Sequence, residues 1–309
     1  MLKRRYGCIL TDYLKNEMIK ILIFGSKGFI GRNIVDSFSK EKKFILFTPS
    51  KEECNLLNFL DVKEYIQNVN PDFIINTAYI GVSSDIKISK VYLSKNLSIS
   101  KNILYSLKAN MNIKKIIYFG SGLEYGDNKT AINETFPSSP KNFYARVKTK
   151  NSKASLALAK KINAPLIVIK PFNLYGPYDN KSVIFHLIKS VIKNEKIILT
   201  KGEQIRDYLY ITDLVKLLNI IINNYEAVEN NSILNVGSGV GIPLNQIFVK
   251  IFKLMDSKVE YKTRVYRSND YFNQIADINK AKKLFNWYPS TSLDLGLSKT
   301  IEWVRRVEV

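Results

Sequence analysis

A short apolar run followed by three evenly spaced glycines, near the start of the chain, constrains the fold more than any other feature. Residues 19–24 read Ile-Lys-Ile-Leu-Ile-Phe, which suits a strand. Gly25, Gly28 and Gly31 follow directly, and residues 29–38 carry apolar side chains at helical spacing. Strand, tight turn and helix together place free backbone N–H groups and the positive end of a helix dipole where a diphosphate can bind. The spacing G-x-x-G-x-x-G therefore predicts a dinucleotide site, although it differs from the commoner G-x-G-x-x-G.

Strands and helices alternate through the first half of the chain. Apolar runs predict strands at residues 44–47, 71–76, 114–119 and 166–170, and helical periodicity predicts helices at 60–68, 89–110 and 143–162. Such alternation is typical of right-handed βαβ units and of a parallel sheet covered on both faces. Ligands of such sheets bind beyond the carboxyl ends of the strands. The residues that follow these strand ends are Gly25, Thr77, Ser121 and Pro171. We therefore expect an α/β fold with a Rossmann-type, doubly wound parallel sheet.

The regular alternation of predicted strands and helices ends after residue 172. Helices are predicted at 183–194, up to 223, at 244–255, 279–285 and 295–304, with strands at 197–199, 208–211 and 233–236 and a charged loop at 202–207. We expect residues 18–172 to bind the dinucleotide and residues 173–309 to form a smaller α/β lobe for the substrate, with the chain crossing back to the first part. Residues 1–17 are expected to be an extension outside the fold, disordered or a non-native start.

Charge and composition narrow the function classes. The 309 residues include 47 lysines and arginines against 27 acidic residues, a formal net charge of +20. The lysines are spread along the whole chain, so we expect anionic small molecules rather than nucleic acid as partners. No run is long and apolar enough to span a bilayer, and Cys8 and Cys54 lack metal-ligand spacing. We therefore expect a reduced, cytoplasmic protein that binds no metal and no membrane.

Two stretches carry groups suited to proton transfer. Ser121 follows a predicted strand, and Tyr144 and Lys148 stand four residues apart on one face of a predicted helix. A tyrosine has an ordinary pKa of about 10, and a nearby ammonium lowers that pKa by favouring the phenolate. A serine hydroxyl within reach would hold a substrate oxygen while the tyrosine gives or takes a proton. A tyrosine and a lysine at this spacing are also common surface neighbours, but their order after the glycine turn favours catalysis.

Taken together, these motifs resemble the extended short-chain dehydrogenase/reductases, also called the NAD-dependent epimerase/dehydratase family. Further segments that carry the resemblance are residues 125–126, 171–177, 206–213, 276–281 and 287–289. The resemblance implies a Rossmann-type fold and a catalytic triad of Ser121, Tyr144 and Lys148. It also implies a homodimer joined through the helices at 89–110 and 143–162, although their small and apolar residues could equally pack within one subunit.

The resemblance also implies which residues contact the ligands. Those expected to bind the cofactor are Gly25, Lys27, Gly28, Phe29, Ile30, Gly31, Ser50, Lys51, Asn55, Leu56, Thr77, Ala78, Tyr144, Lys148 and Pro171. Those expected to bind a nucleotide sugar are Ser121, Gly122, Leu123, Asn173, Arg206 and Arg267. An arginine fork suits a diphosphate. Asn173 could instead cap a turn, and the two arginines could form surface pairs.

Departures from the family pattern exclude some of the reactions that the family catalyses. Dehydratases of the family carry an Asp-Glu pair after the catalytic hydroxyl, where this chain has Gly122 and Leu123. The chain looks most like nucleotide-sugar 4-ketoreductases of the GDP-fucose synthase type. Those enzymes also epimerise with a Cys and a His, at positions that fall here at Leu123 and near Ser182. The single histidine, His186, lies in an apolar helical run and is expected to be packed. We therefore expect NADPH-dependent reduction of a nucleotide-activated 4-keto-6-deoxy sugar for surface polysaccharide, which needs only the triad.

The cofactor separates this function from that of a 4-epimerase, which also needs only the triad. NAD-binding members usually end the second strand with an acidic residue, whereas residues 47–51 here read Phe-Thr-Pro-Ser-Lys. Lys27, Ser50 and Lys51 could surround the 2′-phosphate of NADP, or the lysines could be ordinary exposed side chains. We favour NADP over NAD. An NAD-dependent UDP-hexose 4-epimerase stays the alternative, and a non-catalytic NADP-binding sensor is favoured less.

Overall fold

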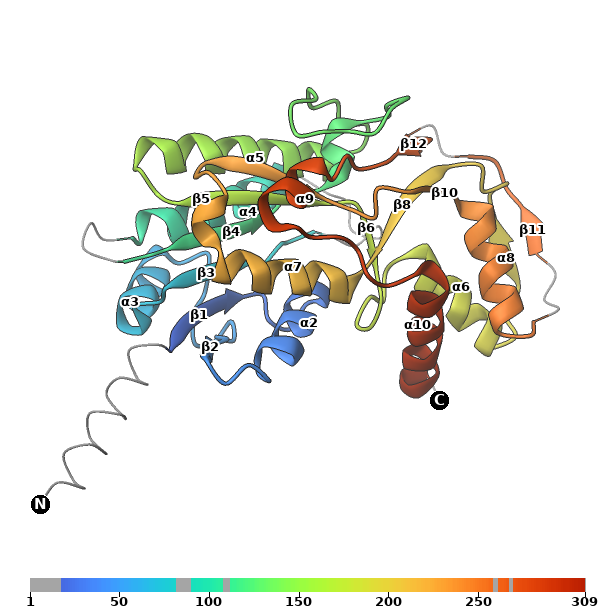
Figure 1. Ribbon diagram of the computed structural model, residues 1–309, viewed down its shortest axis with the longest axis horizontal. Helices are drawn as coiled ribbons and strands as arrows, with labels where there is room; N and C mark the ends of the chain where they lie inside the picture. Colours follow the sequence, from blue (N-terminus) through green and yellow to red (C-terminus); the bar gives the residue numbers. More distant parts are fainter. Residues whose placement is uncertain (1–17, 82–89, 108–111, 258–260, 267–268, 309) are drawn as a thin grey trace, which may run out of the picture.

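The computed structural model describes residues 18–81, 90–107, 112–257, 261–266 and 269–308, and a parallel sheet forms its centre (Figure 1). The sheet has six strands in the order β2-β1-β3-β4-β5-β9. They are β1 (Ile19–Phe24), β2 (Phe44–Phe47), β3 (Phe73–Asn76), β4 (Lys115–Phe119), β5 (Leu166–Pro171) and β9 (Ser232–Val236), and every neighbouring pair is parallel. The predicted doubly wound α/β sheet is confirmed. The extension predicted at residues 1–17 lies outside the described residues.

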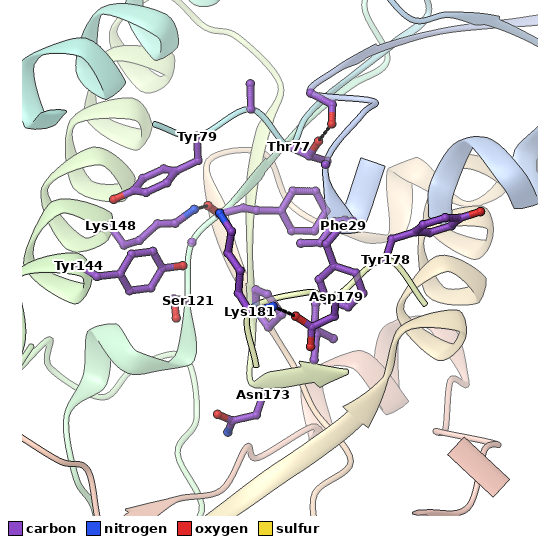
Figure 2. Close-up of a pocket in the computed structure, with 18 of the residues that line it drawn as sticks. Phe29, Thr77, Tyr79, Ser121, Tyr144, Lys148, Asn173, Tyr178, Asp179 and Lys181 are labelled. Atoms are coloured by element: carbon purple, nitrogen blue, oxygen red, sulfur yellow. Dashed lines mark hydrogen bonds between the residues drawn. The ribbon is translucent and has the colours of Figure 1, made fainter. Parts of the chain in front are cut away.

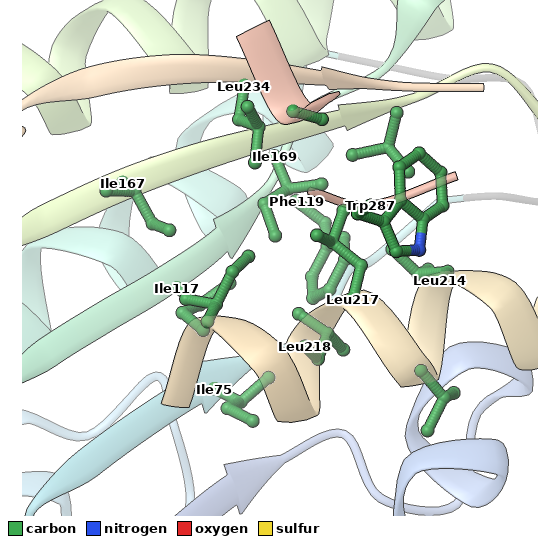
Figure 3. Close-up of a cluster of buried hydrophobic side chains, with 14 of the residues drawn as sticks. Ile75, Ile117, Phe119, Ile167, Ile169, Leu214, Leu217, Leu218, Leu234 and Trp287 are labelled. Carbon is green, nitrogen blue, oxygen red and sulfur yellow. The ribbon is translucent and has the colours of Figure 1, made fainter. Parts of the chain in front are cut away.

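Alternating side chains of the strands supply two hydrophobic cores, one on each face of the sheet. In β1, Ile21 and Ile23 belong to one core, and Leu22 and Phe24 belong to the other. The first core packs against α2 (Phe29–Phe38), α7 (Ile211–Asn223) and α9 (Asn279–Phe285), as Figure 3 shows for α7. The second core packs against α3 (Phe59–Val69), α4 (Lys90–Tyr105) and α5 (Phe143–Lys161). Both faces are thus covered, as a parallel sheet requires.

After β5 the chain builds a second, smaller unit. A mixed sheet contains β6 (Asn173–Tyr175), β8 (Ile205–Tyr210), β10 (Gly241–Pro243) and β12 (Asn273–Gln274), and β7 (Ile197–Leu199) pairs with β11 (Tyr261–Thr263). Three helices enclose its core: α6 (Val183–Ile192), α8 (Leu244–Leu254) and α10 (Leu293–Glu308). Two short 3-10 helices, η1 (Gly122–Tyr125) and η2 (Tyr225–Ala227), complete the described elements. Because α7 and β9 pack with the first sheet, the chain crosses back between the two parts.

The structure corrects the sequence prediction at one segment. The expected charged loop at 202–207 is partly wrong, because its last three residues begin strand β8. This strand pairs with β6, β10 and β12, and those long-range pairings outweigh its charged sequence. Strands β6, β10, β11 and β12 have only two or three residues each, too few to give a periodic signal. None of the helices in the described ranges has the length and hydrophobicity that a bilayer span requires.

Candidate functional site

A cavity of about 620 Å³ lies at the carboxyl ends of the central strands and is lined by residues from both parts of the chain. Figure 2 shows Ser121, Tyr144 and Lys148 on one side of it, with Phe29 of α2 on the opposite side. The cavity therefore brings together the ends of β1, β3, β4 and β5. This is the position that the sequence predicted for a ligand.

The glycine turn forms one wall of this cavity. Gly28 N–H donates to Gly25 O over 3.0 Å, and Gly25 has φ of +79°, which favours glycine. A Cβ at Gly31 would lie 2.3 Å from Gly25 O, so only glycine allows the helix to approach the turn. Thr77 Oγ1 donates to Phe24 O and Gly25 O, which fixes the turn against β3. This cradle fits a dinucleotide diphosphate, because Gly28 at the N-cap of α2 offers no side chain to occupy the first N–H groups of the helix.

Most of the expected cofactor residues line the cavity. They are Gly25, Lys27, Gly28, Phe29, Ile30, Thr77, Ala78, Tyr144, Lys148 and Pro171. The lining does not include Gly31, Ser50, Lys51, Asn55 and Leu56. Asn55 accepts a hydrogen bond from Leu57 N–H, and Leu56 O accepts one from Asn102. Their part in cofactor binding stays a prediction.

The turn after β2 contains two acidic residues, Glu52 and Glu53, which lie just beyond residues 47–51. Glu52 follows Lys51 directly, and hydrogen bonds from its own backbone and from Ser50, with a smaller effect of Lys27 and Lys51, lower its pKa. Ser50 N–H donates a hydrogen bond to the carboxylate of Glu53, so a side chain of the turn already binds this backbone N–H group. Lys51 and two carboxylates thus share the turn for which the sequence predicts a contact with a 2′-phosphate or a ribose hydroxyl.

The three proton-transfer residues are placed by local structure. Ser121 is the N-cap of η1 and accepts a hydrogen bond from Leu123 N–H. Helix α5 begins at Phe143, and the side chain of its N-cap residue Asn142 accepts a hydrogen bond from Ala145 N–H. Tyr144 lies in its first turn, and Lys148 follows one turn later on the same face.

Buried contacts fix the lysine. Lys148 Nζ donates to Phe119 O over 2.8 Å at the end of β4, and it lies 4.2 Å from the centre of the Tyr79 ring. That ring also packs edge-on against Tyr144, with 5.6 Å between the ring centres. Tyr79 could not be predicted from the sequence, because nothing in the spacing of one tyrosine after β3 marks it as a neighbour of α5.

Burial dominates the electrostatics of this pair. It raises the pKa of Tyr144; Glu124 adds to the rise, and a hydrogen bond with Ser121 opposes it. Burial lowers the pKa of Lys148 from its ordinary 10.5 to about 8, against an opposing effect of Glu124. The pKa of Tyr144 is therefore raised overall, contrary to the expectation that Lys148 lowers it, because desolvation of the phenol is the largest effect. Near neutral pH the tyrosine holds its proton and can donate it.

The segment after β6 also lines the cavity, which the sequence did not predict. Tyr178 O–H donates a hydrogen bond to Asp36 over 2.8 Å. The Arg32 guanidinium lies 5.3 Å from the centre of the Tyr178 ring. Asn33 Nδ2 donates to Pro177 O over 2.9 Å. These contacts tie the segment after β6 to α2, and Arg32, Tyr178, Asp179 and Lys181 all join the lining. They depend on residues about 140 positions apart, which no local pattern reveals.

A second cavity, also of about 620 Å³, adjoins the first within the smaller unit. Asn173, Leu174 and Lys181 line both cavities. Among the expected substrate residues, Ser121, Leu123 and Asn173 line the first cavity and Asn173 and Arg206 line the second. Gly122 lines neither and packs against the Phe172 ring, and Arg267 lies outside the described residues.

Several cationic side chains surround the second cavity. Arg206, partly held by Ile205 O and Tyr271 O, is joined there by Lys181, Lys196 and Arg264. His186 is exposed and lines this cavity, so the expectation that it is packed is wrong. It lies on the outer side of α6, whose neighbours Phe185 and Leu187 supply the buried face. The described residues hold no group of three or more His, Cys, Asp or Glu that could bind a metal ion.

A doubly wound parallel sheet whose glycine turn faces a serine, a tyrosine and a lysine across one cavity is typical of dinucleotide-dependent enzymes. Residues 21–237 match the family described as NAD dependent epimerase/dehydratase, and the chain belongs to this family.

Individual relatives agree with this assignment. The chain is 28% identical to GDP-L-colitose synthase of Yersinia pseudotuberculosis, over 92% of this chain and 97% of that protein. It is 25% identical to GDP-6-deoxy-D-talose 4-dehydrogenase of Aggregatibacter actinomycetemcomitans, over 89% and 94%. Its fold is similar to that of UDP-glucuronic acid 4-epimerase from Bacillus cereus, solved with UDP-glucuronic acid and NAD, with a TM-score of 0.83, 21% identity and coverage of 94% and 100%. The chain is thus an enzyme of a family that modifies nucleotide sugars.

Proposed function

We propose that the protein reduces a nucleotide-activated 4-keto-6-deoxy sugar with NADPH. One observation carries this proposal: Ser121, Tyr144 and Lys148 meet in one cavity opposite the glycine turn. The carboxylate next to them in the chain, Glu124, is buried and bound by Lys170, so it is not free to serve in an elimination of water. The site therefore offers a proton donor without the acid and base pair of a dehydratase.

Each side chain has a part in this reaction. Bound NADPH would supply the hydride that the carbonyl carbon receives. Tyr144 donates its phenolic proton to the carbonyl oxygen, which becomes the product hydroxyl, and Ser121 holds that oxygen by a hydrogen bond. The ammonium of Lys148 stabilises the phenolate left on Tyr144 until solvent returns the proton.

The second cavity suits the nucleotide end of such a substrate. Arg206, Arg264 and Lys196 provide positive charge for a diphosphate beside the site of proton transfer. The names of two relatives, a GDP-L-colitose synthase and a GDP-6-deoxy-D-talose 4-dehydrogenase, support a deoxysugar nucleotide. A UDP-sugar 4-epimerase is the second candidate, because the triad also suffices for it and a structural neighbour of that kind holds NAD.

A direct assay separates the two candidates. Purified protein is incubated with NADPH and a panel of GDP-, dTDP-, UDP- and CDP-4-keto-6-deoxy sugars, and absorbance of the nicotinamide is followed. Stoichiometric loss of NADPH with one nucleotide is the expected result. Interconversion of UDP-hexoses without net consumption of cofactor, and no loss of NADPH with any ketosugar, would replace the reductase with the epimerase. Binding of NADPH without turnover in either assay would support the sensor.

The choice of cofactor can be tested on two lysines. In Lys27→Ala/Lys51→Ala, the Kd for NADPH is expected to rise roughly 10-fold or more, because each lysine is a point-charge partner of the 2′-phosphate. The Kd for NADH, which lacks that phosphate, is expected to stay within about 2-fold. Both values are measured by quenching of tryptophan fluorescence. An equal rise for the two cofactors would show that the lysines do not recognise the 2′-phosphate.

A further inference from the structure

A buried ion pair lies beside the triad. Glu124 Oε2 and Lys170 Nζ are 3.1 Å apart, and their side chains are only 1% and 2% exposed. Glu124 is the third residue of η1, which begins directly after Ser121, and Lys170 lies near the end of β5. The pair therefore connects the segment that carries the catalytic serine with the neighbouring central strand.

The other oxygen of Glu124 binds the catalytic segment itself. Oε1 accepts hydrogen bonds from Ser121 N–H over 2.9 Å and from Ser152 Oγ over 3.0 Å. Ser152 lies one helical turn after Lys148, on the same face of α5. One carboxylate thus holds together the start of η1, the strand β5 and the helix that carries Tyr144 and Lys148.

This arrangement is costly for the fold. Burying two charges costs free energy that their attraction does not fully offset, and an apolar pair of similar size would stabilise a fold at least equally well. The pair is also closely enclosed, because a Cβ at Gly120 would lie 2.5 Å from Glu124 Oε1. The Lys170 ammonium lies 4.1 Å from the centre of the Tyr125 ring. A charge kept in such surroundings next to proton-transfer groups points to a role in their chemistry.

We propose that Glu124 is a positioning residue of the active site: held by Lys170 and Ser152, it fixes the backbone of Ser121 and thereby the hydroxyl that works with Tyr144. The inference rests on the proposed function, since it takes Ser121 and Tyr144 as the groups that act on the substrate oxygen. Glu124 lies outside the lining of the cavity, so it acts through these residues and not on the substrate.

The charge of Glu124 acts on the same groups. It adds to burial in raising the pKa of Tyr144, and it opposes the burial that lowers the pKa of Lys148 to about 8. The charged or titratable groups around it are Lys170 from β5, Tyr125 from η1, Tyr144 and Lys148 from α5 and Tyr79 from the segment after β3. Removing the carboxylate is therefore expected to lower the pKa of both Tyr144 and Lys148.

The test removes both charges together, so that no ammonium is left buried without a partner. Glu124→Gln/Lys170→Met is expected to keep its circular dichroism spectrum and to lose roughly 10-fold or more in kcat, because a small displacement of Ser121 suffices. KM is expected to change by less than about 3-fold. The matched control is Lys115→Met, which removes a buried lysine bound to Val228 O and Asn230 at the opposite end of β4. It should leave kcat and the pH profile unchanged.

A milder variant and a second readout keep the test decisive. Ser152→Ala keeps both charges and removes one partner of Oε1, so kcat is expected to fall with its pH profile in place. Independently of turnover, NMR of ¹³C-lysine-labelled protein follows the Cε signal of Lys148, assigned by its loss in Lys148→Met. Its midpoint is expected near pH 8 in the wild type, from the pKa of about 8, and lower in Glu124→Gln, which removes the negative charge alone.

The outcomes separate the two proposals. A wild type that reduces no ketosugar contradicts the proposed function, while the lysine titration still tests Glu124. A folded double variant that keeps the wild-type kcat, together with a Glu124→Gln variant that keeps the wild-type Lys148 midpoint, overturns the positioning role, whatever the substrate proves to be.

Discussion

Replacing Tyr144 with phenylalanine is expected to lower kcat for NADPH-dependent reduction by about 10³-fold, while binding of NADPH stays within about 2-fold. The physical reason is that the variant keeps the ring but loses the proton that the carbonyl oxygen must receive. Its ring contact with Tyr79, 5.6 Å between centres, needs no hydroxyl and remains. Stopped-flow absorbance with the ketosugar identified by the panel measures kcat, and fluorescence titration measures the Kd of NADPH.

Tyr118→Phe is the matched control for this variant. Tyr118 lies on β4, is buried, and donates its hydroxyl to Ser100 O away from the cavity. The control removes a buried hydroxyl without touching the proposed chemistry, so its kcat should equal that of the wild type. If Tyr144→Phe retains more than about a tenth of the wild-type kcat, another group donates the proton and the role proposed for Tyr144 is wrong.

Replacing Lys148 with methionine is expected to abolish reduction and at the same time to stabilise the fold near neutral pH. Burial lowers the pKa of Lys148 from 10.5 to about 8, which corresponds to a cost of about 3 kcal/mol for the protonated side chain. Loss of the hydrogen bond from Lys148 to Phe119 O offsets about 1 kcal/mol of this gain in stability. The free energy of unfolding at pH 7 should therefore rise by about 2 kcal/mol, as measured by urea denaturation.

The pH dependence of this gain gives the sharper measurement. Below pH 8 the lysine is protonated in both the folded and the unfolded wild type, so the full cost is present. Between pH 8 and 10.5 only the unfolded chain keeps the proton, and the stability of the wild type rises toward that of the variant. Lys153→Met, which replaces an exposed lysine of the same helix, should show no such trend. A variant that is less stable than the wild type at pH 7, or a gain that is constant up to pH 10, would contradict this account.

The parts of the fold that could be predicted are those that local spacing determines. The run of residues 19–24 and the glycines after it specify β1, the turn and α2 within 20 residues of chain, and Tyr144 and Lys148 share a helix face because of their spacing alone. The order of motifs then predicted the sheet and the cavity at its carboxyl edge. None of these inferences needed a contact between distant residues.

The parts that could not be predicted depend on long-range contacts. Asp207 lies in a charged segment, yet its carboxylate is buried because Ser238, Gly239 and Ala276 donate hydrogen bonds to it. Glu124 and Lys170 are 46 positions apart and become partners only when β4 and β5 pair. The direction of the pKa of Tyr144 likewise depends on how much water the folded protein removes from the phenol, which its spacing from Lys148 does not reveal.

Asn173, Leu174 and Lys181 form a wall that the two cavities share, and in the proposed reaction this wall would couple binding of the nucleotide to placement of the sugar. In the proposed reaction, a nucleotide sugar bound across this wall would place its diphosphate in the second cavity and its sugar in front of Ser121. Affinity gained far from the reacting carbon can thus hold the sugar in the one orientation that reacts. A sugar without its nucleotide would enter the same space but would not be held in one orientation. We therefore expect such a sugar to show both a lower kcat and a higher KM.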